Sequence, residues 1–202
     1  MDIQATMQAL QRRGFVPHLC KNGAEAVELA KQLIPVGSKV GIGGSLTVKQ
    51  IGLDQALFSD GRTVYSHATV SKEQQPNLWS LARSGEWYIS SVNAMTADGD
   101  LLNIDGTANR VSSLIFGVAN ILYVVGVNKI APDLNAAIER ARNIAAPLNA
   151  RRLQRNVPCA ETGVCSYCDC PECICNTTVI VHHPTRVQKS VHVILIEEEL
   201  GL

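Results

Sequence analysis

The chain of 202 residues carries 18 lysines and arginines against 18 aspartates and glutamates, so its formal net charge is zero. This length predicts one full-sized domain, with or without a small appendage. The neutral balance provides no overall field for nucleic acid or anionic membranes. Apolar stretches such as 191–196 are too short to span a bilayer, and the first residues lack an apolar signal core. We therefore expect a cytoplasmic protein that binds neither nucleic acid nor membrane.

Helical and strand patterns alternate along the first half of the chain. Apolar spacing predicts helices over 3–13, 22–34, 45–53 and 75–85, with Asn22 and Ser45 as caps. Between them, strands are expected over 15–20, 38–44, 62–67 and 86–93. This alternation is typical of α/β proteins.

The segment Val40–Thr47, "VGIGGSLT", joins a predicted strand to a predicted helix through glycines. Gly43, Gly44 and Ser45 would let an anionic ligand approach the backbone, with Thr47 in the following turn. Neither nucleotide-binding fingerprint is present. An ordinary tight turn would explain the pattern equally well.

The segment Ser91–Arg110, "SVNAMTADGDLLNIDGTANR", follows a predicted strand and contains two Asp-Gly pairs. Such pairs are typical of hairpin turns, and a hairpin could be the whole explanation. Alternatively, the segment lines a pocket at the end of the strand. In that case Asn93 and Thr96 would contact the ligand, and Asp105, Asn109 and Arg110 would be candidates for catalysis.

The second half continues the alternation. Residues 111–119 predict a short helix, 120–130 a strand buried on both faces, and 134–155 a long helix interrupted by Pro147. Two β-rich runs, 177–183 and 190–199, flank a Pro184 turn and are expected to pair. The predicted class is α/β: a Rossmann-like, mostly parallel sheet with helices on both faces.

Six of the seven cysteines lie between 159 and 175, within "CAETGVCSYCDCPECIC". A tight cluster without an export signal indicates metal binding rather than disulfides. The two-residue gaps in Cys165–Cys168 and Cys170–Cys173 let paired thiolates grip one metal. These gaps suit both structural zinc and an iron–sulfur cluster, and spacing alone does not separate them.

In their order, the segments "VGIGGSLT", "SVNAMTADGDLLNIDGTANRV", "VVGVNKI" and "CAETGVCSYCDCPECICN" resemble the LUD-domain family of LutC-like lactate-utilization proteins. The resemblance covers nearly the whole chain and implies a fold of the NagB/RpiA/CoA-transferase type. It implies an LUD core over 1–156, a cysteine-rich metal segment over 157–176, and C-terminal strands over 177–202 that complete the core. Ala108 stands where family members often have glycine.

The resemblance also implies a ligand set and a role. The four cysteines common in the family match Cys159, Cys165, Cys168 and Cys175, whereas Cys170 and Cys173 are additional. They would hold a [4Fe–4S] cluster, or alternatively zinc, in a redox accessory of lactate or organic-acid oxidation. Its partners would be a small anionic metabolite, iron–sulfur proteins of that oxidation and a second copy in a homodimer. The alternatives are a sugar-phosphate isomerase or CoA-transferase-like enzyme with structural zinc, and a non-catalytic organic-acid sensor.

Overall fold

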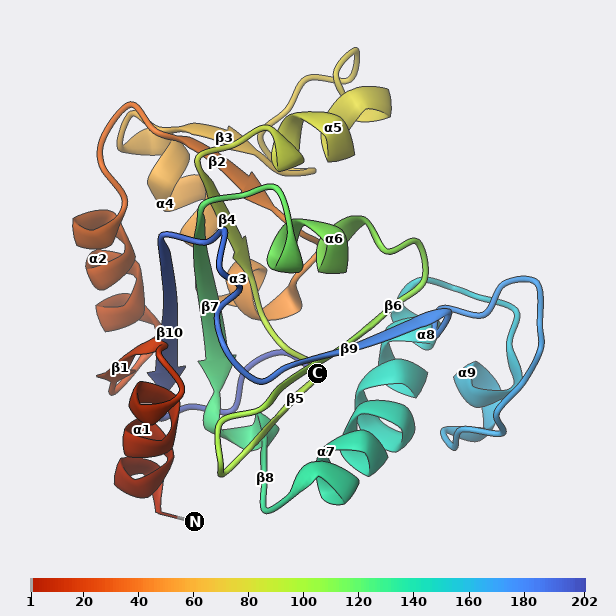
Figure 1. The fold of residues 1–202 in the computed structure, drawn as a ribbon. Coiled ribbons are helices and arrows are strands. Elements are labelled where there is room, and N and C mark those ends of the chain that lie inside the picture. The colour runs from red at the N-terminus through yellow and green to blue at the C-terminus, as the bar shows by residue number, and fades with distance from the viewer. Residues whose placement is uncertain (1) are drawn as a thin grey trace.

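A computed structural model describes residues 2–202 and contains two β-sheets covered by helices (Figure 1). The larger sheet has six strands in the order β1-β10-β7-β4-β2-β3, and every pairing in it is parallel. Its strands are β1 (Val16–Cys20), β2 (Lys39–Ile42), β3 (Thr63–Tyr65), β4 (Trp87–Ser90), β7 (Asn120–Gly126) and β10 (Ser190–Ile196). The predicted α/β, Rossmann-like class is confirmed.

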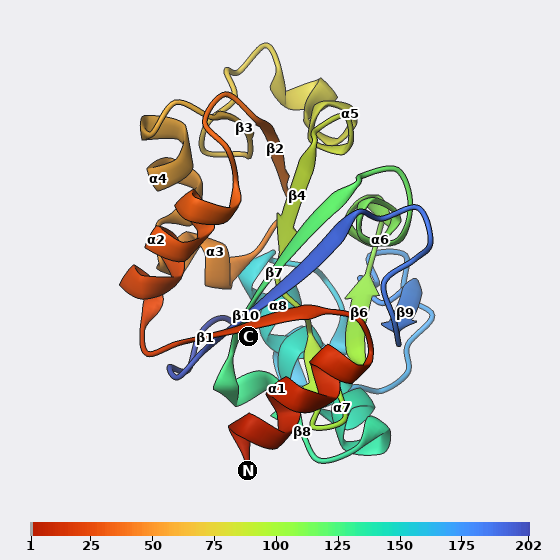
Figure 2. The ribbon, with the colours of Figure 1, turned by 60° about the vertical axis from the view of Figure 1, so that its left-hand side comes forward.

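Helices cover both faces of the large sheet because its central strands are apolar on both sides. Along β7, Tyr123 faces one core cluster while Leu122 and Val124 face the other. The first cluster is covered by α1 (Ile3–Arg12), α5 (Leu78–Arg83) and α6 (Asn109–Ile115), and the second by α2 (Gly23–Leu33), α3 (Leu46–Gln50) and α4 (Leu53–Ser59). Figure 2 shows α2 and α4 on one side of the strands and α6 on the other.

The smaller sheet has the order β8-β5-β6-β9 and is built around a hairpin. Its strands are β5 (Ala94–Thr96), β6 (Leu101–Asp105), β8 (Ile130–Ala131) and β9 (Thr177–Val181). β5 and β6 pair antiparallel, with Ala94 opposite Leu102. The hairpin predicted within 91–110 is therefore confirmed, and it carries Asp105 to the end of β6.

The expected pairing of 177–183 with 190–199 is wrong. β9 pairs antiparallel with β6 in the small sheet, whereas β10 lies between β1 and β7 in the large one. The physical reason is burial. Val193–Ile196 are completely buried and need cover on both faces, while β9 is only partly buried and completes a sheet edge.

The long helix expected over 134–155 is continuous but changes its winding. α7 (Leu134–Arg140) runs into a π-helical turn, Ala141–Ala145, and then into α8 (Ala146–Arg152). Pro147 lies in the first turn of α8, directly after the wide turn, so it does not break the helix. The remaining elements are α9 (Pro158–Thr162) and two short 3₁₀ turns, Gln75–Asn77 and Val127–Lys129.

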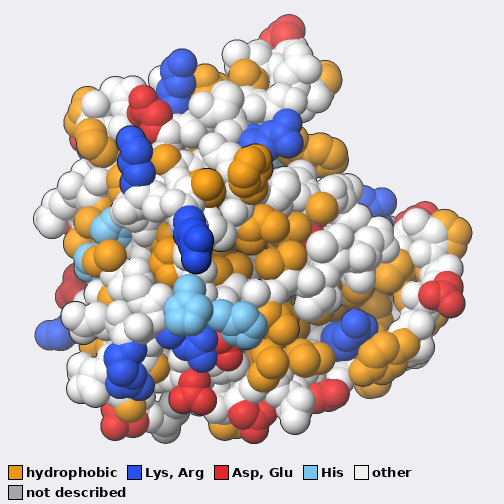
Figure 3. Space-filling model, in the orientation of Figure 1, with side chains coloured by type: hydrophobic (Ala, Val, Ile, Leu, Met, Phe, Trp, Pro, Cys, Tyr) orange, Lys and Arg blue, Asp and Glu red, His pale blue; other side chains and the backbone are white. Residues whose placement is uncertain are grey.

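The surface agrees with the neutral composition. On the face drawn in Figure 3, positive and negative side chains are interspersed. Within residues 2–202, every helix is too short or too polar to cross a membrane.

Gly41 of β2 is required by a close approach of α5. A Cβ atom at this position would lie 2.0 Å from the main-chain oxygen of Ala82. Because that atom belongs to a packed backbone, we expect Gly41→Ala to destabilise the fold by about 3 kcal/mol. The measurement is the midpoint of urea unfolding at an unchanged m-value.

Gly44 provides the matched control in the same segment, since a Cβ there would meet nothing within 4 Å. Gly44→Ala should change the unfolding free energy by less than about 0.5 kcal/mol. Equal midpoints for the two variants would show that α5 yields to the added methyl group.

Candidate functional site

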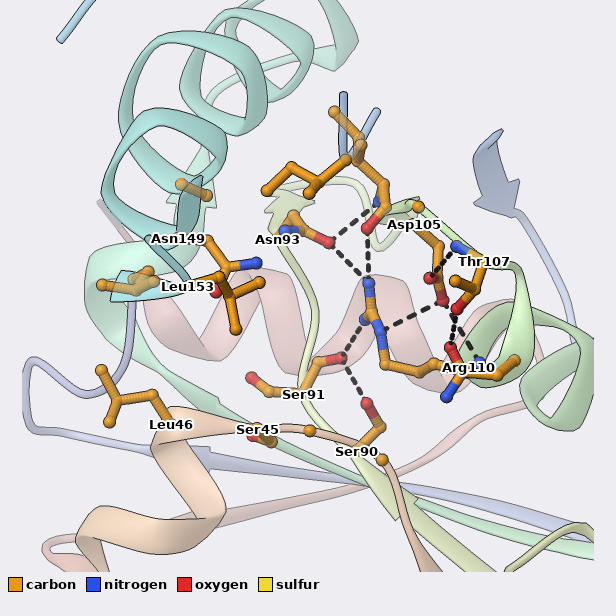
Figure 4. A pocket seen from close by; sticks show the side chains of 18 of the residues that line it. Ser45, Leu46, Ser90, Ser91, Asn93, Asp105, Thr107, Arg110, Asn149 and Leu153 are labelled. Carbon is orange, nitrogen blue, oxygen red and sulfur yellow. Dashed lines mark hydrogen bonds and ion pairs between the residues drawn. The ribbon is translucent and has the colours of Figure 1, made fainter. Parts of the chain in front are cut away.

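A cavity of about 310 Å³ lies where β2, β4 and β6 end, opposite the helix α8 (Figure 4). Open α/β sheets bind ligands at this edge. The turn after β2 contributes Gly43, Gly44 and Ser45, and α8 contributes Asn149. The predicted glycine turn and the predicted hairpin therefore face the same space. We call this cavity the central pocket.

Arg110 is the main brace of the central pocket. Its terminal nitrogens donate to the carbonyls of Ser91 (3.2 Å) and Ile104 (2.7 Å) and to the side-chain oxygens of Asn103 (2.7 Å) and Asn93 (3.0 Å). These four bonds tie the segment after β4 to β6 and use every hydrogen of the two terminal nitrogens. In this arrangement the guanidinium positions the wall of the pocket rather than reaching for a ligand.

Asp105 caps α6. Its Oδ2 accepts the backbone N–H groups of Arg110 and Val111, both at 3.2 Å, and its Oδ1 accepts that of Thr107 at 3.3 Å. The residue at the N-cap position, Ala108, has no capping side chain and adopts φ 58°, a conformation that favours glycine. The carboxylate therefore stabilises the strained start of α6, and it lies 3.7 Å from Nε of Arg110.

The other predicted residues divide into two groups. Asn93 and Asn109 line the central pocket, as do Gly43, Gly44 and Ser45. Thr47 and Thr96 are buried outside its lining. Thr96 accepts the N–H of Asp100 inside the hairpin (2.9 Å), so its hydroxyl serves the β-turn. The hydroxyl of Thr47 instead accepts a hydrogen bond from a lysine.

That lysine, Lys129, is the pocket residue that the sequence interpretation missed. It is 3% exposed, lines the central pocket, and donates from Nζ to Thr47 Oγ1 (2.9 Å) and Ser91 Oγ (3.0 Å). Burial, together with the positive charges of Arg140 and Arg110, lowers its pKa to about 7. A signal was present, since this lysine lies in the short turn that follows the apolar run of the central strand β7.

Five cysteines line a second cavity of about 210 Å³, which we call the cysteine cavity. They are Cys159, Cys165, Cys168, Cys173 and Cys175. The four cysteines of the predicted ligand set thus meet in one place, together with Cys173. Cys170 lies outside this cavity and packs against the small cluster of Ala150, Val157 and Cys159.

The thiols of the cysteine cavity influence one another electrostatically. Burial, together with the negative charges of Cys173, Cys165 and Cys159, raises the pKa of Cys175 to about 12. Arg142 is the nearby cation: its NH1 lies 3.9 Å from Cys165 Sγ, and its guanidinium stacks over Tyr167. An all-sulfur donor set of this kind fits zinc or an iron–sulfur cluster. Within residues 2–202, however, no three His, Cys, Asp or Glu side chains are placed so that they could hold a metal ion.

Ala146 and Ile174 line both cavities. Ala146 is the first residue of α8, and Ile174 lies in the cysteine-rich loop next to Cys175. The central pocket and the cysteine cavity are therefore neighbours that share walls.

This fold and these two cavities define a Rossmann-like α/β protein with a ligand pocket at the carboxyl ends of its strands and an adjoining thiol cluster. The family model of the LUD domain matches residues 3–196, and the chain belongs to this family. Among solved structures, it is similar to a DUF162 family protein from Deinococcus radiodurans, at 10% identity and a TM-score of 0.53. That match covers 96% of this chain and 95% of the other, and at this identity it supports the fold alone. No curated protein matches the chain.

Proposed function

We propose that the chain is a redox accessory of lactate or organic-acid oxidation. It would bind a small anionic metabolite in the central pocket and hold a cysteine-ligated [4Fe–4S] centre in the cysteine cavity. The observation that carries this proposal is the wall of Ala146 and Ile174 that the two cavities share. Membership of the LUD-domain family, which is associated with lactate utilization, supports it.

The chain's own residues would divide the work. Cys159, Cys165, Cys168 and Cys175 would hold the cluster, which when bound accepts and releases single electrons. Arg142 offers positive charge beside the thiolates, and Lys129 offers it in the central pocket.

The cysteine-rich loop is also accessible from outside. Val164 is 60% exposed and Tyr167 is 67% exposed. A centre held by this loop would lie near the protein surface, where exchange of electrons with iron–sulfur partner proteins requires it to be.

The isomerase and CoA-transferase alternative receives less support from the geometry. It would use Asp105 as a general base, yet both oxygens of this carboxylate accept backbone N–H groups of the α6 start. A base needs a free acceptor within reach of the substrate proton. The proposed redox role does not require Asp105 to act as a base.

Anaerobic purification followed by metal and sulfide analysis tests the proposal. We expect a brown protein with about four iron and about four sulfide ions per chain, since a cubane cluster contains these atoms. The visible absorption should bleach on reduction. A colourless preparation containing one equivalent of zinc and no sulfide would refute the redox role and favour a structural staple.

A further inference from the structure

Lys129 occupies the inner wall of the central pocket and is almost completely buried. Among the residues described, its amine has two hydrogen-bond partners, the neutral hydroxyls of Thr47 and Ser91. Gly201 packs closely against the amine, since a Cβ atom added to Gly201 would lie only 2.7 Å from Nζ. An ammonium group with neutral partners and little water is costly to keep charged.

The charged groups that face Lys129 are mostly cations. Arg140 of α7 donates to the main-chain oxygens of Asn128 (2.9 Å), Asn93 (2.5 Å) and Leu202 (3.3 Å). Arg110 of α6 has one acidic neighbour, Asp105, at 3.7 Å.

Tyr88 also lines the pocket, and burial raises its pKa to about 12, so it stays neutral. His67, Arg152 and Arg155 line the pocket as well, and all three are exposed. The buried Lys129 and the partly buried Arg110 and Arg140 thus share one side-chain carboxylate.

We propose that Lys129 is the charge partner of the pocket's ligand, that this ligand is a short carboxylic acid, and that it binds together with a proton. The proposal deepens the function proposed above, because it rests on the same pocket. A carboxylate at Nζ supplies the missing negative charge and stabilises the ammonium form of the lysine.

The number of available donors favours a carboxylate over a phosphate. The terminal nitrogens of Arg110 are committed to Ser91, Asn93, Asn103 and Ile104, and Arg140 is committed to main-chain oxygens. Lys129 is then the charged donor that remains for a ligand on the inner wall, assisted by nearby hydroxyls, whereas Arg152 and Arg155 line the pocket from its exposed side. One ammonium group matches a monoanion, whereas phosphate sites gather several N–H donors.

The affinity for the ligand should depend on pH in one definite direction. The ligand selects the protonated lysine, and without ligand the pKa of Lys129 is about 7. Below this pH the amine is already charged, so the affinity is constant. Above it the competent fraction falls, and with it the affinity, by about tenfold for each pH unit.

Calorimetric titration of the purified protein with acetate, L-lactate, pyruvate and inorganic phosphate tests this assignment. We expect a carboxylic acid to bind about thirtyfold more weakly at about pH 8.5 than at about pH 6. Near pH 8, the measured enthalpy should also depend on the buffer, because a proton is taken up. Affinity that does not change with pH, tighter binding of phosphate, or binding of none of these acids would overturn the proposal.

Lys129→Met gives a second readout, with Lys49→Met as the matched control. Lys49 lies on α3, is exposed and does not line the pocket. We expect Lys129→Met to lose at least tenfold in affinity at about pH 6 and to show no pH dependence, whereas Lys49→Met keeps the wild-type profile. Retained, pH-dependent binding in Lys129→Met would assign the proton to another group and refute the proposal.

The result remains decisive if Lys129→Met does not fold, because the wild-type pH profile stands alone. It is also separable from the redox proposal. Acid binding and metal content are measured independently, so either can fail while the other holds.

Discussion

Arg110→Met is expected to lower the free energy of unfolding by about 4 kcal/mol, the scale for removing one partner from a buried ionic network. The side chain of Arg110 is 14% exposed. Its loss would strand the side-chain oxygens of Asn93 and Asn103 and the carbonyls of Ser91 and Ile104 without their donors. Urea unfolding monitored by circular dichroism gives the measurement.

Arg83→Met is the control for this substitution. Arg83 lies in the last turn of α5 and is exposed, so its replacement should change the unfolding free energy by less than about 0.5 kcal/mol. If both variants unfolded at the same urea concentration, Arg110 would not brace the pocket. Its guanidinium would then be free to bind a ligand directly.

The second large effect is expected in the cysteine cavity. If the chain holds the proposed [4Fe–4S] centre, Cys168→Ser should abolish its iron and sulfide, because serine is a poor substitute for a thiolate on a soft metal centre. The same loss is expected for Cys159→Ser and Cys175→Ser, since all three thiols line one cavity. Iron and sulfide per chain after anaerobic purification are the quantities to compare.

Cys170→Ser provides the matched control, only two residues from Cys168. Cys170 lies outside the cysteine cavity, so its variant should retain the full complement of iron and sulfide. Loss of the centre in Cys170→Ser together with retention in Cys168→Ser would reverse the assignment. Cys173 lines the cavity without belonging to the family-like set, and Cys173→Ser measures whether a fifth thiol can serve.

The sequence predicted those parts of the fold that depend on the residues of a single segment, such as the burial of a strand or the position of a turn. The unbroken apolar run of β7 predicted cover on both faces, and the pair Asp98-Gly99 predicted the turn of the hairpin. Partner choice was not encoded locally. Val179 and Val193 both belong to β-rich runs around a turn, yet they lie in different sheets, because the depth of burial of each run decides its neighbours.

The candidate site was predicted to a similar degree. The glycine turn at Gly43 and the amide of Asn93 were placed at the pocket from their positions after strands. The hydrogen-bond partners of the pocket side chains could not be predicted from the sequence, since they depend on groups far apart in the chain. Arg110 is occupied by groups of β6 and of the segment after β4, and Lys129 is buried beside residues near the C-terminus.

The π-helical turn Ala141–Ala145 joins the helices α7 and α8, whose side chains make different contacts. Before the turn, Arg140 donates to the carbonyl of Asn93. Within the turn, the side-chain oxygen of Asn143 accepts the N–H of Cys165 at 3.2 Å. After the turn, Asn149 of α8 lines the central pocket. A widened turn accommodates one additional residue, and each residue of a helix rotates direction by about 100°. In a relative without the additional residue of this turn, the helix would continue, but the side chains of α8 would point in another direction. Insertions and deletions at this turn would therefore change the lining of the central pocket and leave the sheet as it is.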